Sequence, residues 1–189
     1  MTKKFFTAIL DESEKIDQGP MAAGSEVSMS KVVLSLLLDN QVGVLSRVAG
    51  LFSRRGYNID SITAGETENP NRTRMTIVAR GEPEVLEQIE KQLAKLVDVV
   101  DIKMLPLDES VCRELILIKV GVTAEERQQV IAIADIFRAR IVDVAFDSVM
   151  IELTGEQQKL EAFINLLDKF HIKELARTGI TGLARGCAD

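Results

Sequence analysis

Two halves of this 189-residue chain repeat one order of predicted strands and helices. In each half an apolar strand is followed by an amphipathic helix, two strands, a second helix and a final strand. The two halves also share part of their sequence. Gly81-Glu82 and Leu86-Glu87 in the first half recur 74 positions later as Gly155-Glu156 and Leu160-Glu161. Two β-α-β-β-α-β units predict an α+β protein with two tandem ferredoxin-like domains, each with both helices on one sheet face. The other face needs a cover, so we expect dimerisation or packing of one half on the other.

Hydrophobic spacing predicts the bounds of the elements. In the first half, strands are predicted at 32–38, 57–64, 73–80 and 99–105, with helices from Val44 to a glycine stop at Gly56 and from Pro83 onward. In the second half, strands are predicted at 114–121, 140–146, 148–153 and 172–176. The first helix of that half begins with Thr123 and Glu126 at the spacing of a capping box.

These elements divide the chain into four parts. Residues 1–28 lack sustained periodicity and are predicted to be an extension, either disordered or left over from cloning. Residues 29–107 form the first domain and residues 113–178 the second, with a short linker that contains Cys112. The glycine-rich stretch 179–189 has no helix after it, which favours a flexible tail over a phosphate-binding loop.

Composition excludes several classes of chemistry. The chain has one histidine and two cysteines, which cannot build a His-rich metal centre, a CxxC zinc site or a disulfide scaffold. A net charge of −6 provides no basic footprint for nucleic acid. No apolar run approaches the roughly 20 residues that span a bilayer. We therefore expect a cytoplasmic protein that binds neither nucleic acid nor membrane and holds no metal.

No catalytic motif accompanies the reactive side chains. His171, at a helix-to-strand junction, could act as a general base, but spacing places no carboxylate or nucleophile beside it. Cys112 is better explained as an unremarkable linker thiol than as a reactive one. The sequence thus predicts no catalytic residue.

One segment does carry an argument for binding, the turn from Asp39 to Leu45 where a strand ends and a helix begins. Free N–H groups at a helix start favour a carboxylate, and Gly43 permits close approach to the backbone. Asn40 can accept a hydrogen bond from an ammonium group, and Val44 and Leu45 add apolar surface. Carboxylate, amine and apolar side chain together describe a small aliphatic amino acid. The alternative is that Asn40 caps the turn and Gly43 only eases the backbone.

The second half offers an internal comparison. The position equivalent to Gly43 is Glu126, with Glu125 beside it. Carboxylates in the first helical turn occupy the positive end of the helix dipole and repel an anionic ligand. Only the first half is therefore expected to bind an amino acid in this way.

The chain resembles the small regulatory subunit of acetolactate synthase over about residues 29–186. The motifs that carry the resemblance are Leu38-Asp39-Asn40, Gly43-Val44-Leu45-Ser46-Arg47-Val48, Leu51-Phe52-Ser53-Arg54-Arg55-Gly56-Tyr57-Asn58-Ile59, Arg74-Met75-Thr76-Ile77, Leu96-Val97-Asp98-Val99, Arg113-Glu114-Leu115 and Gly182-Leu183-Ala184-Arg185-Gly186.

The resemblance implies an N-terminal ACT domain, a second ferredoxin-like domain and a homodimer without an active site. Such a subunit binds and activates a large catalytic subunit that condenses pyruvate, and it confers feedback inhibition by a branched-chain amino acid, usually valine. Thiamine diphosphate, Mg and FAD would belong to that catalytic subunit. The effector-binding residues implied are Asn40, Gly43, Val44 and Leu45 of one protomer with Asn58 and Ile59 of its neighbour.

Two other classes of function stay open at this point. One is a free-standing amino-acid sensor or transcriptional regulator, which would need a helix-turn-helix or a basic arm. The other is a free-standing enzyme of the ferredoxin-like fold with His171 as its base.

Overall fold

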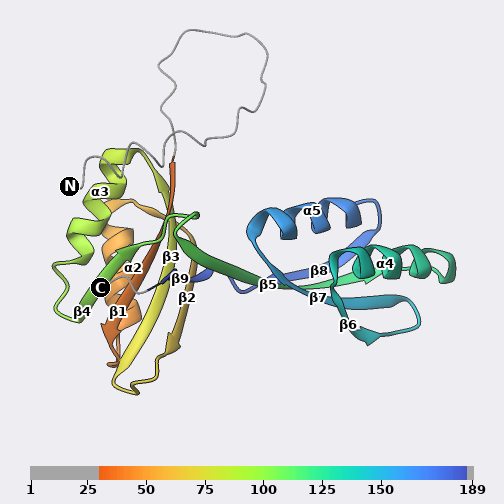
Figure 1. Ribbon diagram of the computed structural model, residues 1–189, viewed down its shortest axis with the longest axis horizontal. Coiled ribbons are helices and arrows are strands. Elements are labelled where there is room, and N and C mark those ends of the chain that lie inside the picture. Colours follow the sequence, from red (N-terminus) through yellow and green to blue (C-terminus); the bar gives the residue numbers. More distant parts are fainter. Residues whose placement is uncertain (1–29, 187–189) are drawn as a thin grey trace, which may run out of the picture. The chain divides into compact units, whose positions relative to one another are not determined.

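The computed structural model describes residues 30–186, which divide into two compact units. Within these residues, unit 1 contains 30–110 and 183–186, and unit 2 contains 111–182. Figure 1 shows that each unit is an antiparallel sheet with its two helices on one face. The predicted extension 1–28 lies outside the described residues.

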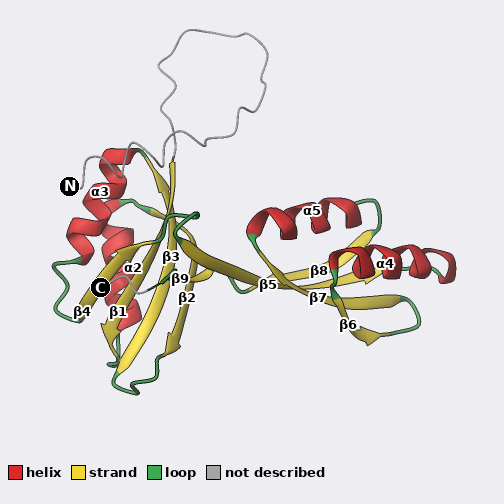
Figure 2. Ribbon diagram, in the orientation of Figure 1, coloured by secondary structure: helices red, strands yellow, loops and turns green. Residues whose placement is uncertain are grey.

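Unit 1 is built around the buried strand β1. Its strands lie in the order β2-β3-β1-β4, so β1 pairs with β3 on one side and β4 on the other. Figure 2 shows the two helices packed together against this sheet. The elements are β1 (Ser30–Asp39), α2 (Val44–Arg55), β2 (Asn58–Glu66), β3 (Arg72–Gly81), α3 (Pro83–Leu93) and β4 (Val99–Met104).

Unit 2 repeats this topology, with strand order β6-β7-β5-β8. The equivalence of the two strand orders confirms the predicted tandem β-α-β-β-α-β architecture. The elements are β5 (Ser110–Gly121), α4 (Ala124–Phe137), β6 (Arg140–Val144), β7 (Ser148–Gly155), α5 (Gln157–Leu167) and β8 (His171–Arg177).

Two local predictions differ from the structure. The glycine-rich stretch contains a further strand, β9 (Thr181–Ala184), which pairs with β5. Arg185 strengthens this return of the chain, because its backbone N–H donates to Glu109 O at 2.7 Å. The prediction of a flexible tail is therefore wrong for Thr181–Ala184. Cys112 lies in β5 and not in a linker, since that strand begins at Ser110.

The shared letters of the repeat mark equivalent junctions. Gly81 and Gly155 each end the third strand of their unit, and the following glutamates are the N-cap residues of α3 and α5. The two leucines, Leu86 and Leu160, are 4% and 0% exposed in their cores. The repeated letters thus mark where a strand ends and a helix begins, and which face of that helix is buried.

Alternating apolar residues of β1 pack against the helices of unit 1. Leu34, Leu36 and Leu38 are at most 1% exposed, and Phe52 of α2 packs in the same cluster. On the face of the sheet turned away from the helices, the paired residues Val33 and Val78 are also buried. At these positions the second face is therefore inaccessible to solvent within the single chain.

Unit 2 has its own core, in which Phe163 of α5 is fully buried against β5 and β7. We predict that Phe163→Ala lowers the free energy of unfolding by about 3–5 kcal/mol, because it removes a large apolar side chain from a packed interior. The matched control is Phe146→Ala, since Phe146 is 98% exposed and its loss should leave stability nearly unchanged. Urea unfolding measures both, and equal effects of the two substitutions would contradict the assigned core.

Candidate functional site

The first turn of α2 is open to an anion. Gly43 is its N-cap residue, no side chain caps the helix, and no acidic residue lies in the first turn. The first N–H groups of an α-helix have no partner within the helix, and the helix dipole is positive there. This terminus therefore offers donors and positive potential to a carboxylate.

Gly43 is needed here for two reasons. Its φ of 85° lies in the left-handed region, which residues other than glycine rarely adopt. A Cβ at this position would also lie 3.3 Å from Nη1 of Arg47. Glycine therefore permits the backbone conformation of the turn and leaves the space beside it free of a Cβ.

The turn is held by the loop between β2 and β3. The backbone N–H of Asn40 donates to Asn71 O at 2.9 Å, and its side-chain Nδ2 donates to Pro70 O at 3.0 Å. An ion pair between Asp39 and Arg72 joins the same two segments. The Asn40 side chain does not cap α2. Its bond to Pro70 O holds the turn, as the structural alternative expects, and engages only the Nδ2 end of the amide. Its Oδ1 is the amide atom suited to accept from an ammonium group.

The apolar residues of the turn divide into two groups. Leu45 is 48% exposed and Val42 is completely exposed, so both present apolar surface beside Gly43. Val44 is 7% exposed and packs in the core of unit 1. The Val44 side chain therefore offers a ligand little surface, and its backbone N–H already donates to Gln41 O at 3.2 Å. Val42 adds an exposed side chain that the prediction omitted.

Asn58 and Ile59 lie at the other end of the sheet. They begin β2, where Asn58 is level with Arg80, whereas Asp39 is level with Arg72. The eight residue steps from Arg72 to Arg80 span about 26 Å at about 3.3 Å per step. One protomer therefore does not bring the six predicted residues together.

The equivalent terminus in unit 2 is closed by its own side chains. Thr123 Oγ1 accepts from the N–H of Glu126 at 3.2 Å, and the Glu126 carboxylate accepts from the N–H of Thr123 at 2.8 Å. These hydrogen bonds lower the pKa of Glu126, the one from the Thr123 backbone most. The predicted capping box is confirmed, and an anionic ligand would meet carboxylates here.

Arg47 of α2 and Asp98, the residue before β4, both contact the turn in unit 1. The Arg47 guanidinium contacts both carboxylate oxygens of Asp98, at 2.6 and 2.7 Å. Asp98 lies 51 residues further along the chain, so no local pattern predicts the pair.

The reactive residues of unit 2 are dispersed. His171 is the exposed first residue of β8, and Cys112 lies in β5.

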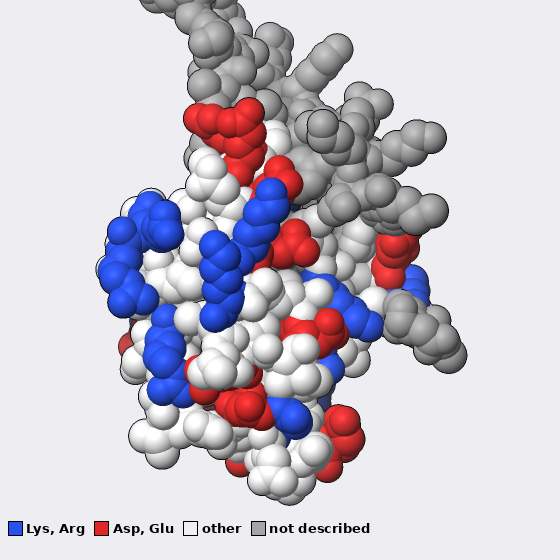
Figure 3. Space-filling view, turned by 90° about the vertical axis from the view of Figure 1, so that its left-hand side faces the viewer, with Lys and Arg blue, Asp and Glu red and all other residues white. Residues whose placement is uncertain are grey.

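Among residues 30–186, no group of three or more His, Cys, Asp or Glu side chains could hold a metal ion. In the same range, no helix combines the length and apolar character needed to cross a membrane. The space-filling view in Figure 3 shows acidic and basic side chains side by side over one face of the protein.

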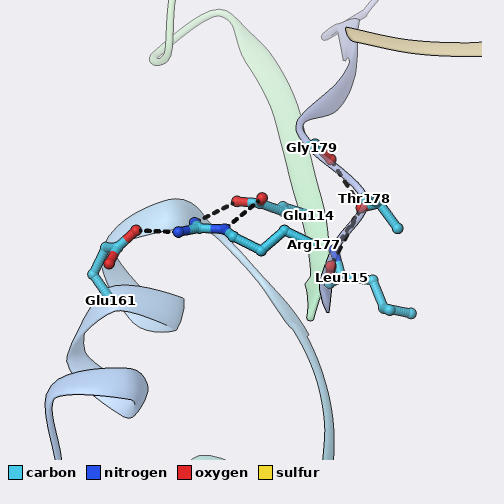
Figure 4. Close-up of polar contacts among 6 residues, drawn as sticks. All are labelled: Glu114, Leu115, Glu161, Arg177, Thr178 and Gly179. Atoms are coloured by element: carbon cyan, nitrogen blue, oxygen red, sulfur yellow. Dashed lines mark hydrogen bonds and ion pairs between the residues drawn. The ribbon is translucent and has the colours of Figure 1, made fainter. Parts of the chain in front are cut away.

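A polar cluster of unit 2 surrounds Arg177, at the end of β8. Figure 4 shows its guanidinium between Glu114 and Glu161, with both oxygens of Glu114 at 2.9 Å and Glu161 at 2.8 Å. The hydrogen bonds to Glu114 are the main cause of a raised Arg177 pKa. The cluster joins β5, β8 and α5, so its evident role is to hold the unit together.

Two family models match the chain. Residues 34–101 match the ACT domain of proteins like the acetohydroxyacid synthase small subunit, and residues 113–186 match the small subunit of acetolactate synthase. A probable acetolactate synthase small subunit from Methanothermobacter thermautotrophicus is 52% identical over 82% of this chain and 92% of its own length. The isozyme 3 small subunit from Salmonella typhimurium is 47% identical over 82% of this chain and 95% of its own.

A solved structure is similar over both units. The crystal structure of the acetolactate synthase small subunit from Thermotoga maritima matches with a TM-score of 0.76 and 45% sequence identity. The match covers 82% of this chain and 98% of that one. The comparison extends the likeness from sequence motifs to the arrangement of the fold.

The contrast between the two helix starts gives a prediction. Thr123→Ala should lower the free energy of unfolding by about 1 kcal/mol, because the N–H of Glu126 loses its acceptor. Thr123→Ser keeps a hydroxyl and is the matched control, with an unfolding free energy close to that of the native protein. Because the folded-state pKa of Glu126 is lowered, its contribution is present above its unfolded-state pKa and is lost as the pH falls through the folded value. Urea unfolding of the three proteins, with the native protein repeated at acidic pH, measures both effects.

Proposed function

Because the chain belongs to the family of acetolactate synthase small subunits, we propose that it is a regulatory subunit that binds and activates the catalytic large subunit. It also makes that subunit sensitive to feedback by a branched-chain amino acid, with valine as the expected effector. The observation that carries the effector part is the open start of α2, next to exposed apolar side chains and the amide of Asn40.

Each part of the amino acid has a counterpart at this turn. The carboxylate accepts hydrogen bonds from the N–H groups of the first turn of α2, close to Gly43. The ammonium group donates to Oδ1 of Asn40. The branched side chain packs on the exposed apolar surface of Leu45 and Val42. The closed start of α4 explains why unit 2 takes no part.

A second protomer completes the site in this proposal. β2 is an edge strand of its sheet, so its outer edge can pair with another β2. Antiparallel pairing of two such edges reverses one strand against the other and moves Asn58 and Ile59 toward the partner's turn. This arrangement resolves the separation of about 26 Å within one chain. The homodimer and the effector site are therefore one proposal.

Regulation follows from linkage between binding sites. An effector held between two protomers favours the arrangement of the dimer that it bridges best. If the catalytic subunit prefers a different arrangement, each ligand changes the affinity of the other by the same factor, typically a coupling of about 1–3 kcal/mol. The condensation of pyruvate and its cofactors stay with the catalytic subunit, and this chain contributes no catalytic residue.

Calorimetry with valine, leucine and isoleucine tests the effector site and identifies its ligand. We expect one saturable isotherm with one effector per site, and Gly43→Asp should abolish it because a carboxylate then stands where the ligand's carboxylate binds. Gly43→Ala is the control, since it carries the same backbone strain and the same crowding by Arg47 without the charge. It should weaken binding less than the aspartate. Native affinity in the aspartate variant would show that the site lies elsewhere.

The partnership with a catalytic subunit is tested by activity. The purified chain should not condense pyruvate, and adding it to a large subunit should raise that subunit's rate and make it respond to the effector found by calorimetry. Condensation by this chain alone would refute the proposal and favour the free-standing enzyme. An unchanged rate of the large subunit across a range of mixing ratios would refute the activating role.

A further inference from the structure

The guanidinium of Arg47 connects the candidate effector turn to a buried carboxylate. Its Nε and Nη2 donate to the two oxygens of Asp98, whose side chain is 7% exposed. Its Nη1 points toward the turn and donates to Val42 O at 3.5 Å, a long hydrogen bond. The hydrogen bonds to Asp98 raise the pKa of Arg47 above its ordinary value, which already keeps a guanidinium charged.

Asp98 is itself joined to the start of the turn. Its backbone oxygen accepts from the N–H of Asp39 at 2.9 Å, and Asp39 is the last residue of β1. The segment from Asp39 to Gly43 is therefore held at both ends by the same pair, through Asp98 at Asp39 and through Arg47 at Val42. The loop between β2 and β3 holds it in the middle, at Asn40.

The pair also bears on Gly43. Nη1 of Arg47 occupies the space 3.3 Å from a Cβ built on that residue, so the guanidinium forms one wall of the space beside the glycine. An arginine held at two points by a carboxylate has a fixed orientation, which a lysine ammonium cannot reproduce. The shape of the turn thus depends on the fork and not only on a positive charge.

We propose that Arg47, oriented by Asp98, is the positioning residue of the effector site, holding the turn so that the first N–H groups of α2 converge on the ligand's carboxylate. This inference rests on the proposed function for the identity of the ligand, while the positioning of the turn is a property of the chain alone. Arg47 acts through the backbone of residues 39–43 and is not required to touch the ligand.

Unit 2 provides a matched control. Arg177 holds Glu114 by the same pair of atoms, Nε and Nη2, and the Glu114 side chain is 6% exposed. The two forks are alike in geometry and burial, but only the one in unit 1 lies at the turn. Arg177→Lys therefore imposes a comparable loss of packing and pairing without altering the candidate site.

The experiment measures effector affinity in four full-length variants: Arg47→Lys, Asp98→Asn, their double mutant and Arg177→Lys. We expect Arg47→Lys and Asp98→Asn each to raise the Kd for valine about tenfold, or about 1.4 kcal/mol. The double mutant should be no weaker than the single ones, because both break one interaction. Arg177→Lys should keep the native Kd. Native affinity in folded Arg47→Lys and Asp98→Asn, or additive losses in the double mutant, would overturn the proposal.

Hydrogen exchange without effector separates this inference from the proposed function. The N–H groups of Asp39, Asn40 and Gln41 are hydrogen-bonded and should exchange faster in Arg47→Lys and in Asp98→Asn, but not in Arg177→Lys. If the native protein binds none of the three branched-chain amino acids, the proposed function fails, and these exchange rates alone decide whether Arg47 positions the turn. Unchanged exchange in both unit 1 variants would show that it does not.

Discussion

Burial of two helices on one face of each antiparallel sheet is the constraint from which the rest of this structure follows. The alternating apolar residues of β1 must meet the apolar faces of α2 and α3, so the chain has to leave the strand and enter the helix within a few residues. Asn40 to Gly43 make that connection. The candidate site is thus a consequence of how a central strand turns into a packed helix.

The two units show how one fold acquires different chemistry at equivalent positions. α2 begins at a glycine with positive φ and has no side-chain cap, whereas α4 begins at a threonine with a complete capping box. The cap stabilises α4 and fills its N-terminus with Glu126. The start of α2 lacks that side-chain stabilisation, and of its first N–H groups that of Val44 donates to Gln41 O. The proposed effector binding depends on this difference between the two helix starts.

Local patterns predicted the architecture well, because the helical repeat of 3.6 residues and the strand repeat of two residues both act between residues close in sequence. The buried faces of β1 and α2, the helix stop at Gly56 and the capping box at Thr123 all follow from residues a few positions apart. β9 and the first residues of β5, around Cys112, were not predicted as strand. β9 is short and rich in small residues, and it is stabilised by pairing with β5, which is distant in sequence. Val44 was expected to add apolar surface at the turn, but its side chain packs in the core of unit 1.

The order of elements, the tandem repeat and the contrast between Gly43 and Glu126 are properties of the linear chain, because periodicity and helix capping depend on neighbours in sequence. The framework of the turn is not local. Asn40 bonds to Pro70 across 30 residues, and Arg47 bonds to Asp98 across 51. The separation of Asn58 from the turn likewise follows from strand register. Only packing of the sheet brings such groups together or keeps them apart, since no periodicity of the sequence relates residues so far apart along the chain.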